Sequence, residues 1–329
     1  MKKVKTEDAI GLTLCHDITR IIPGVEKGVM FAKGHVIQAE DVEDLLDAGK
    51  SHVFVWIEGS EETKDMVHEN AAAKRLVDAL LGAGLQASGP REGKYACTAT
   101  TPGVIQIDQG LLFKINSIEE ICVSTIYDKQ VVGVGDPVMS CRVIPLFIKE
   151  AKLRAVEKLC QGKAKLLQLS PFRPCKVGLI TTGSEVFTGR VKDASKGYLL
   201  PKLKQFGSSL LAQKIVDDDK NVIANSMLEL LDLGAEMLII TGGMSVDPDD
   251  VTPEAVRSVA TEIVTYGTPV LPGAMFMLAY HHNTPILALP AGVLHAKISV
   301  VDVLLPRILA GEKLTRPTIV RLGHGGLLK

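Results

Sequence analysis

Short apolar runs alternate with helix-spaced apolar positions through the second half of the chain. The runs at 177–180, 210–216 and 237–240 are short and rich in branched side chains, which is typical of buried strands. Between them, residues 198–206 and 221–233 carry apolar side chains at helical spacing, and a glycine follows each segment. This alternation predicts a parallel sheet with helices on both faces.

The remainder of this half continues the pattern with strands at 275–280 and 285–289 and a closing helix at 293–309, broken near Pro306. Pro201 lies within the predicted helix 198–206, so that helix must place it in its first turn. The residues between the two strands, His281-His282-Asn283-Thr284, resemble a metal-binding pair, but adjacent histidines rarely converge without a third ligand. We interpret them as a solvated hairpin turn.

The first half has a different pattern. A helix at 38–48, ended by Gly49, and a strand at 53–57 predict a small α/β unit. Then follow a helix, a β-rich section with a tight hairpin at Asp108-Gln109-Gly110, and a linking helix. The predicted helices are 64–81 and 151–159, and the predicted strands are 103–107, 111–115, 122–127 and 138–148.

Pro171 and Pro174 bracket a stiff joint where the two patterns meet. We therefore predict an α/β protein with a three-layer α/β/α domain and a mostly parallel sheet in its C-terminal half. The predicted segments are a small α/β unit (1–60), a β-rich middle domain with flanking helices (61–170), the α/β domain (171–315) and a C-terminal tail (316–329).

Composition narrows the range of functions. A net charge of −1 over 329 residues, with one Trp, argues against a nucleic-acid surface. No apolar run is long enough to cross a bilayer, and the N-terminus lacks the apolar core of a signal peptide. The six cysteines form no CxxC pair, as expected for scattered thiols in a reducing cytoplasm. We expect a cytoplasmic protein without a nucleic-acid or membrane partner.

Several catalytic patterns are absent or unconvincing. No GxxxxGK[ST] phosphate loop and no GxSxG elbow occurs. Cys15-His16-Asp17 contains a nucleophile, a base and an acid, but neighbours along a strand point to opposite faces and would not converge. We interpret that trio as structural.

The most informative stretch is 241–255, which follows the strand at 237–240. Gly242-Gly243 permits a sharp turn close to a ligand, and Thr252 and Pro253 suit the N-cap and first position of a helix. A helix N-terminus favours phosphate, whereas the three aspartates of the loop do not. Phosphate and carboxylates share a small space if a hard cation such as Mg²⁺ lies between them. The alternative is an acidic surface loop before a capped helix.

Two further polar loops follow predicted strands, at 181–193 and at Asp217-Asp218-Asp219. The carboxyl ends of parallel strands lie at one edge of a sheet, so all three loops can converge there. For the aspartate triplet the alternative is an acidic first turn of a helix, which its dipole stabilises.

Residues 174–312 resemble the molybdopterin-binding domain of molybdenum-cofactor biosynthesis proteins of the MoeA and MogA types. The sequence TGSEV at 182–186 is similar to TGDE[LIV], and TGGMSV at 241–246 is similar to TGGxSx of the molybdate-inserting branch. The sequence DDVTPEA at 249–255 is similar to DxTxEA of the adenylyltransferase and CinA-like branches. Pro272-Gly273 and Leu289-Pro290-Ala291-Gly292 resemble the two proline–glycine turns of the family, PGKP and LPGNP.

The resemblance implies a molybdopterin-binding fold, with molybdopterin or its adenylylated form as substrate or ligand, together with Mg²⁺ and molybdate. It assigns catalytic roles to Glu185, Asp218 and Asp250, and metal binding to Glu185, Asp217, Asp218, Asp249 and Asp250. The ligand-binding residues that it implies are Thr182, Gly183, Ser184, Gly242, Gly243, Ser245, Thr252, Pro272, Gly273, Pro290 and Gly292. It also implies a homo-oligomer, a dimer or trimer, and admits a molybdoenzyme as partner.

The chain departs from the family pattern at three positions. Ser184 replaces an aspartate, Ala274 replaces the lysine of PGKP, and Ala291-Gly292-Val293 replaces GNP. The leading hypothesis is a Mg²⁺-dependent molybdopterin molybdotransferase that inserts molybdate and releases AMP. The alternatives are a non-catalytic molybdopterin carrier or sensor and a CinA-like nucleotide hydrolase.

Overall fold

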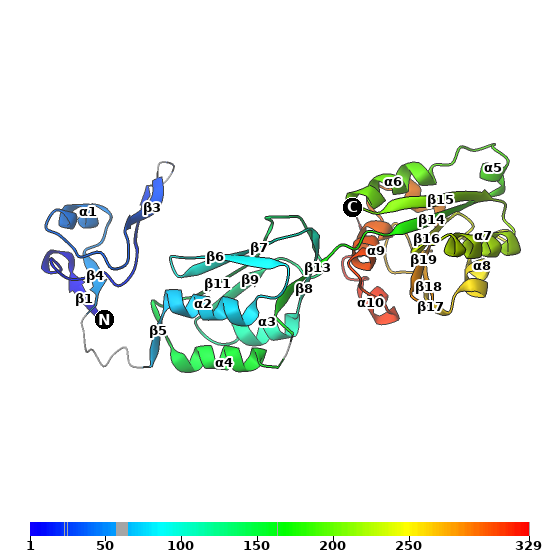
Figure 1. Cartoon of the computed structure of the whole chain (residues 1–329). Helices are drawn as coiled ribbons and strands as arrows, with labels where there is room; N and C mark the ends of the chain where they lie inside the picture. Colours follow the sequence, from blue (N-terminus) through cyan, green and yellow to red (C-terminus); the bar gives the residue numbers. More distant parts are fainter. Residues whose placement is uncertain (23, 25, 57–64, 163, 329) are drawn as a thin grey trace. The chain divides into compact units, whose positions relative to one another are not determined.

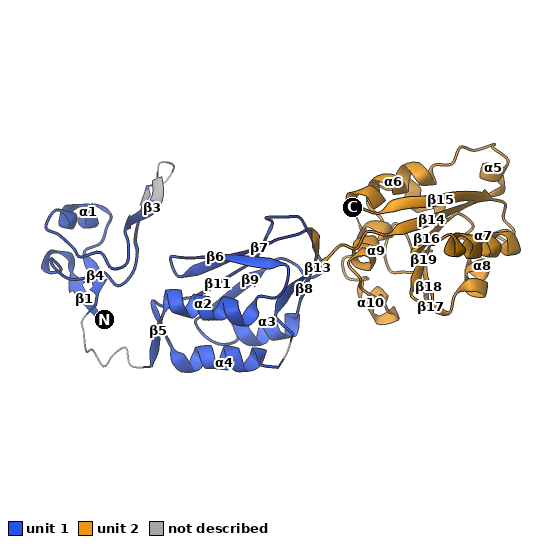
Figure 2. Ribbon diagram, viewed as in Figure 1, with its two compact units in different colours: residues 1–101, 105–169 blue, residues 102–104, 170–329 orange. Residues whose placement is uncertain are grey.

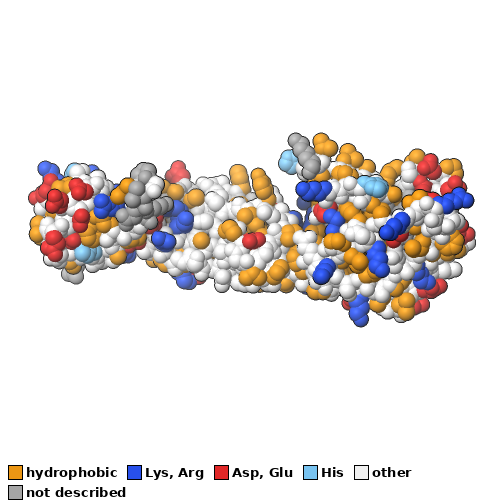
Figure 3. Space-filling view, turned by 90° about the horizontal axis from the view of Figure 1, so that it is seen from above, with side chains coloured by type: hydrophobic (Ala, Val, Ile, Leu, Met, Phe, Trp, Pro, Cys, Tyr) orange, Lys and Arg blue, Asp and Glu red, His pale blue; other side chains and the backbone are white. Residues whose placement is uncertain are grey.

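The computed structural model describes residues 1–22, 24, 26–56, 65–162 and 164–328 (Figure 1). The chain divides into two compact units, of which unit 1 comprises residues 1–101 and 105–169 and unit 2 comprises residues 102–104 and 170–329 (Figure 2). On the face shown in Figure 3, acidic and basic side chains are interspersed over both units, in keeping with the net charge of −1. No helix in the described ranges is long and apolar enough to cross a membrane.

The first part of unit 1 contains two antiparallel strand pairs and one short helix. β1 (Lys2–Lys5) pairs with β4 (His52–Val55), and β2 (Ile18–Ile22) pairs with β3 (Glu26–Phe31). α1 (Asp41–Asp47) ends before Gly49, whose φ of 75° suits glycine, as the sequence predicts. The buried core contains Leu14, Ile37, Leu45, Val53 and Val55. The predicted end of the last strand at 57 and the boundary at 60 lie outside the described residues.

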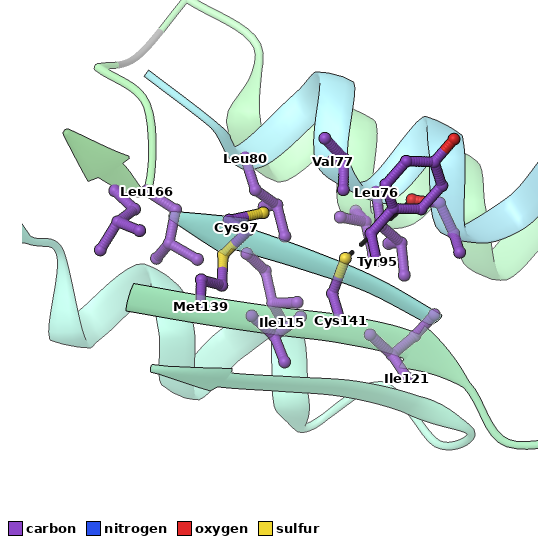
Figure 4. Packing of buried hydrophobic residues seen from close by; sticks show 14 of the residues in the cluster. Leu76, Val77, Leu80, Tyr95, Cys97, Ile115, Ile121, Met139, Cys141 and Leu166 are labelled. Carbon is purple, nitrogen blue, oxygen red and sulfur yellow. Dashed lines mark hydrogen bonds between the residues drawn. The ribbon is translucent and has the colours of Figure 1, made fainter. Parts of the chain in front are cut away.

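The second part of unit 1 contains a four-stranded antiparallel sheet in the order β6-β7-β11-β9, packed against helices, and smaller sheets in the orders β10-β8-β13 and β12-β5. Apolar side chains from α2 and from this sheet fill the core between them (Figure 4). The elements are β5 (Met66–His68), α2 (Glu69–Leu80), β6 (Leu85–Arg91), β7 (Lys94–Ala99), β8 (Gly103–Ile107), α3 (Gln109–Asn116), β9 (Ile121–Thr125), β10 (Val131–Val132), β11 (Pro137–Val143), β12 (Phe147–Lys149), α4 (Glu150–Cys160) and β13 (Leu167–Pro171).

The predicted strand 111–115 and the hairpin before it are wrong. These residues form α3, because the Asp108 carboxylate accepts a hydrogen bond from the Leu111 N–H at 2.8 Å and caps the helix. Leu111 and Ile115, one helical turn apart, are buried, whereas Phe113 is 75% exposed. The helix predicted at 64–81 begins only at Glu69, because residues 66–68 form β5 and pair with β12.

Unit 2 is a three-layer α/β/α domain, as predicted. Its six-stranded sheet has the order β15-β14-β16-β19-β18-β17, in which the first four strands are parallel and the last two antiparallel. The strands are β14 (Lys176–Thr182), β15 (Ser209–Val216), β16 (Met237–Thr241), β17 (Glu262–Tyr266), β18 (Met277–His281) and β19 (Thr284–Leu289). The sequence pattern did not predict β17.

Alternate side chains of these strands enter two different cores. Leu179 and Ile239 pack with α6 (Ser195–Gln205), α9 (Val300–Leu309) and α10 (Arg316–Arg321). Ile180 and Ile240 pack on the opposite face with α7 (Lys220–Asp232) and α8 (Thr252–Val259), as Figure 1 shows. Burial on both faces explains why the strands are continuous apolar runs.

Two helix predictions need correction. α6 begins at Ser195, so Pro201 lies at its seventh position and not in its first turn. The residue four positions before it is Gly197, whose carbonyl therefore receives no amide donor from Pro201. The closing segment breaks before α9 and not at Pro306: a 3₁₀ helix at Ala291–His295 ends before Ser299, which starts α9 with a capping box to Asp302.

The prediction for the two histidines is confirmed. His281 pairs with Thr284 across β18 and β19, and His282 and Asn283 form the two-residue turn between them. His282 has a φ of 53°, as such turns require.

Candidate functional site

A cleft of about 610 Å³ lies at the edge of the unit 2 sheet where the parallel strands end. Loops that follow β14, β15, β16 and β19 line it, as expected for an open α/β sheet. β14 has β15 on one side and β16 on the other, so the chain reverses its direction across the sheet at this strand. Such a reversal leaves room for a ligand between diverging loops.

The first wall of the cleft is the turn after β14. Gly183, with a φ of 134°, precedes α5 (Ser184–Phe187). The Ser184 N–H donates to Oδ2 of Asp218 at 2.9 Å, and its hydroxyl donates to Oδ1 of Asp217 at 2.6 Å. The Ser184 hydroxyl lowers the pKa of Asp217. The loops after β14 and β15 are thereby joined.

Asp218 is a partly buried carboxylate of the cleft. Burial raises its pKa, and the negative charges of Glu185 and Asp217 add to that rise, while hydrogen bonds from Ser184 and Thr182 oppose it. Its Oδ1 atom is buried and has no hydrogen-bond partner among the described residues. Thr241 Oγ1, which also belongs to the cleft, is buried and unpartnered in the same way. Buried polar atoms without partners are costly, so both are suited to a ligand or cation.

The second wall is the glycine turn after β16. Gly242 and Gly243 have φ values of 98° and 58°, which disfavour any other residue. A Cβ on Gly242 would lie 2.4 Å from the Thr182 carbonyl oxygen, and one on Gly243 would lie 2.6 Å from Thr252 Oγ1. Both positions thus require glycine, because the turn is packed directly against β14 and α8.

The acidic loop that follows is held by its own hydrogen bonds. Oδ2 of Asp250 accepts the Ser245 N–H at 2.8 Å, and the Asp250 N–H donates to the Asp247 carbonyl at 3.0 Å. Asp247 and Asp250 line the cleft, whereas Asp249 is exposed outside it. Two carboxylates of this loop therefore lie in the same cleft as Glu185 and Asp218.

Thr252 occupies a different position from the predicted one. The residue before α8 is Val251, so Thr252 is the first residue of the helix and Pro253 the second. Thr252 is fully buried, and its hydroxyl donates to the Gly242 carbonyl at 3.1 Å. Through this bond Thr252 holds the glycine turn in place. Thr252 does not line the cleft.

The cleft brings together most of the residues that the sequence singles out: Thr182, Gly183, Glu185, Asp218, Gly242, Gly243, Ser245, Asp250, Pro290 and Gly292. The others do not line it, namely Ser184, Asp217, Asp249, Thr252, Pro272 and Gly273. The Pro272 carbonyl accepts the Val300 N–H at 3.0 Å, and a Cβ on Gly273 would lie 2.4 Å from Val300 Cγ1. That proline–glycine turn packs against the start of α9.

The sequence assigns no individual role to five polar or flexible side chains of the cleft, although Asp247 is one of the three aspartates noted in the loop 241–255: Lys192, Asp193, Asp247, Met275 and His295. Two of them, Lys192 and Asp193, fall at the end of the polar loop 181–193. Their charge alone gave no signal, because charged residues in loops are usually solvated.

Divalent-cation binding is compatible with this arrangement. No group of three or more His, Cys, Asp or Glu side chains within the described ranges could hold a metal by itself. Mg²⁺, however, is usually bound by one or two carboxylates together with phosphate oxygens of the substrate. The unpartnered Oδ1 of Asp218, with Glu185 and Asp250 in the same cleft, meets that requirement.

The trio Cys15-His16-Asp17 forms no nucleophilic site. Cys15 is fully buried, and its thiol donates to the Phe54 carbonyl at 3.1 Å. Burial raises the pKa of the thiol to about 11, which disfavours the reactive thiolate. All six cysteines are free thiols.

Comparison with known families finds a match for this part of the chain. Residues 178–310 match the family described as "Probable molybdopterin binding domain". The match includes the motifs at 182–186, 241–246 and 249–255, so the resemblance to the molybdopterin-binding domain is confirmed. Residues 3–57 match a domain of unknown function, DUF8806.

Among curated proteins, a molybdopterin molybdenumtransferase of Synechococcus elongatus is 21% identical over 236 residues, which are 65% of this chain and 57% of that protein. A CinA-like protein of Syntrophus aciditrophicus is 35% identical over 81 residues, which are 25% of this chain and 19% of that protein. The chain thus spans little more than half the length of the first relative and about a fifth of the second.

Solved structures are also similar to part of this chain, at low identity. The molybdopterin biosynthesis enzyme MoaB of Thermus thermophilus is 21% identical, with a TM-score of 0.35 over 42% of this chain and 98% of its own. The molybdopterin biosynthesis Mog protein of Mycobacterium ulcerans is 20% identical, with a TM-score of 0.35 over 41% of this chain and 92% of its own.

Proposed function

We propose that this protein acts in molybdenum-cofactor biosynthesis by binding adenylyl-molybdopterin in the unit 2 cleft and inserting molybdate with release of AMP. The observation that carries the proposal is the meeting of the Gly242–Gly243 turn with Asp218, whose Oδ1 atom is buried without a partner among the described residues. A tight glycine turn suits a phosphate, and an unpartnered carboxylate oxygen suits a cation that bridges to that phosphate.

In this scheme the cleft binds the phosphate linkage between pterin and AMP. Asp218 and Glu185 would hold Mg²⁺, which when bound would supply positive charge to the phosphate oxygens. Asp250, held in place by the Ser245 N–H, orients a water molecule toward phosphorus. Water adds across the phosphoanhydride bond, so that AMP leaves and molybdopterin remains for molybdate to bind.

Two alternative functions would use the same cleft. Ala274 in place of the family lysine favours a carrier or sensor that binds without turnover. The local similarity to CinA-like proteins favours a nucleotide hydrolase. The proposal further includes a cytoplasmic location, a homo-oligomer and contact with a recipient molybdoenzyme.

One assay separates these functions. The protein is incubated anaerobically with adenylyl-molybdopterin, Mg²⁺ and molybdate, and AMP release and pterin-bound molybdenum are measured. We expect both to rise together and to stop when Mg²⁺ is chelated. Tight binding without AMP would indicate a carrier, and AMP without bound molybdenum would indicate a hydrolase.

A substitution at Asp218 tests the proposed cation site of the cleft. Asp218→Asn leaves the fold intact but removes the charge that a cation needs, so AMP release is expected to fall at least about 100-fold. An Asp218→Asn protein with full Mg²⁺-dependent turnover would rule out this cation site.

Light scattering of the purified protein measures its molar mass and so tests the proposed homo-oligomer.

A further inference from the structure

The charges lining the cleft are unbalanced. Five of its side chains are carboxylic acids: Glu185, Asp193, Asp218, Asp247 and Asp250. Among the described lining residues only Lys192 and His295 are basic. An oxyanion entering such a cleft is repelled unless a cationic group meets it, and lysine is the one lining side chain with an ammonium group.

The backbone on both sides of Lys192 is fixed. The N–H of Val191 donates to the Glu185 carbonyl at 2.9 Å. On the other side, the Asp193 carboxylate accepts the Ser195 N–H at 2.9 Å and the side-chain amide of Gln213 at 2.6 Å. Burial opposes ionisation of Asp193, but these hydrogen bonds outweigh it and lower its pKa. Asp193 is thus satisfied within the protein and anchors the segment.

Ser195 also connects this segment to the sheet. Its hydroxyl also hydrogen-bonds to Thr181 Oγ1 at 2.8 Å, at the end of β14. Both Thr181 and Ser195 are buried. The loop from 188 to 194 is therefore attached to the same strand that carries Thr182 and Gly183, and Lys192 emerges from a fixed point on the cleft wall.

The Lys192 ammonium has no ion-pair partner within the described part of the chain. Some other lysines of unit 2 do have one: Lys202 pairs with Asp302, and Lys313 pairs with Glu262 at 2.8 Å. Lys192 is exposed, so its flexible four-carbon stem can reach a ligand without breaking an existing contact.

We propose that Lys192 is the oxyanion-binding residue of this cleft. It takes a tetrahedral oxyanion, either the phosphate of a pterin ligand or free molybdate, and Asp193 acts as its positioning residue. This inference rests on the proposed function, because it assumes the same ligand class in the same cleft. It adds a ligand-binding residue on the wall that follows β14.

The test compares wild type with Lys192→Ala and Lys192→Arg. Lys196→Ala is the matched control, because Lys196 is an exposed lysine four residues away that does not line the cleft. Dissociation constants are measured without turnover, by anaerobic fluorescence titration for molybdopterin and by equilibrium dialysis for molybdate. Melting temperatures verify that each variant is folded.

We expect Lys192→Ala to weaken binding of at least one probe about tenfold, as loss of a charged contact does. Lys192→Arg should restore it to within about threefold, because the positive charge is kept. Raising the salt concentration should weaken wild-type binding more than that of Lys192→Ala, because exposed charges are screened. Loss for molybdopterin alone identifies the pterin phosphate as the bound group, and loss for molybdate alone identifies molybdate.

Equal binding of both probes by wild type and Lys192→Ala would overturn the role of Lys192 while leaving the proposed function standing. That role is also overturned if Lys196→Ala loses as much affinity as Lys192→Ala, since the effect would then be one of general surface charge. Failure of wild type to bind either probe would overturn the proposed function and this inference together.

Discussion

The backbone N–H of Ser184 donates to Oδ2 of Asp218 at 2.9 Å, whereas Oδ1 of Asp218 is buried and has no hydrogen-bond partner among the described residues. The turn after β14 thus satisfies one oxygen of the carboxylate. The other oxygen receives no such donor. The acid is positioned, yet its ionised form is poorly stabilised until something binds.

The first prediction concerns stability and pH at Asp218. Its folded pKa is raised, so the folded state holds the proton more tightly than the unfolded chain. Below pH 3.8 the acid is protonated in both states and has no effect, whereas above its folded pKa its buried charge destabilises the fold. Asp218→Asn should therefore be more stable than wild type at pH 7 by up to about 1 kcal/mol.

Urea unfolding at pH 7 and pH 3 measures this difference. The gain should vanish at the lower pH. Saturating Mg²⁺ at pH 7 should stabilise wild type and leave Asp218→Asn unchanged. A variant less stable than wild type at pH 7 would show that the ionised carboxylate is already compensated.

The second prediction separates two neighbouring aspartates. Asp250→Asn keeps an oxygen that accepts the Ser245 N–H, so the loop should keep its shape and the melting temperature should stay within about 2 °C. The lost charge should nevertheless abolish Mg²⁺-dependent AMP release. Asp249→Asn is the control, because Asp249 is exposed outside the cleft and its substitution should leave turnover unchanged. Equal effects of the two variants would argue for a general charge effect.

The third prediction concerns the glycine turn. Gly242→Ala should destabilise unit 2 by roughly 2–4 kcal/mol, from backbone strain at a φ of 98° and a Cβ only 2.4 Å from the Thr182 carbonyl. Gly234→Ala isolates the strain, because Gly234 has a φ of 91° and nothing within 4 Å of its Cβ position. It should cost about 1 kcal/mol. Calorimetric melting of both variants measures the difference, and equal losses would show that the packing against Thr182 relaxes.

The fourth prediction tests unit 1. The Arg75 guanidinium hydrogen-bonds to both Glu150 and Glu157 and so joins α2 to α4. These contacts with Arg75, helped by Arg154, lower the pKa of Glu150 to about 2. The resulting stability is present above the ordinary value of 4.5 and is lost as the pH falls toward 2.

Arg75→Met should therefore lower the free energy of unfolding by about 1–3 kcal/mol at pH 7, with a deficit that shrinks between pH 4.5 and pH 2. Lys74→Met is the control, because Lys74 forms only an exposed pair with Asp78. Its substitution should leave the free energy of unfolding almost unchanged, because exposed ion pairs contribute little. A deficit in Arg75→Met that does not change with pH would assign it to lost packing.

The sequence predicts unit 2 well because its strands are buried on both faces. Continuous apolar runs such as 237–240 leave little choice of structure, and parallel strands place their following loops at one edge. The convergence of Glu185, Asp218 and Asp250 on one cleft follows from topology alone. Their chemical roles remain predictions.

Other features escape prediction because a local signal is ambiguous or because the decisive contact is distant in sequence. Leu111 to Ile115 is apolar enough for a strand, but the Asp108 side chain caps it as a helix, whereas our interpretation of the sequence places Asp108 in a hairpin turn. Thr252 has the chemistry of an N-cap, but its hydroxyl is used by the Gly242 carbonyl. Lys192 gives no signal in the sequence, because its proposed role depends on the acidic side chains that line the same cleft in the folded chain.

The sheet of unit 2 changes direction between β19 and β18. Because β18 runs opposite to the parallel strands, the residue that leads into it, Met275, lies at the cleft together with the loops that leave them. The loop before β18 can lengthen or shorten without shifting the register of β14, β15 and β16. The width of the cleft is therefore adjustable from one side, in evolution or by design, while the charged groups that line it stay in place on the other strands.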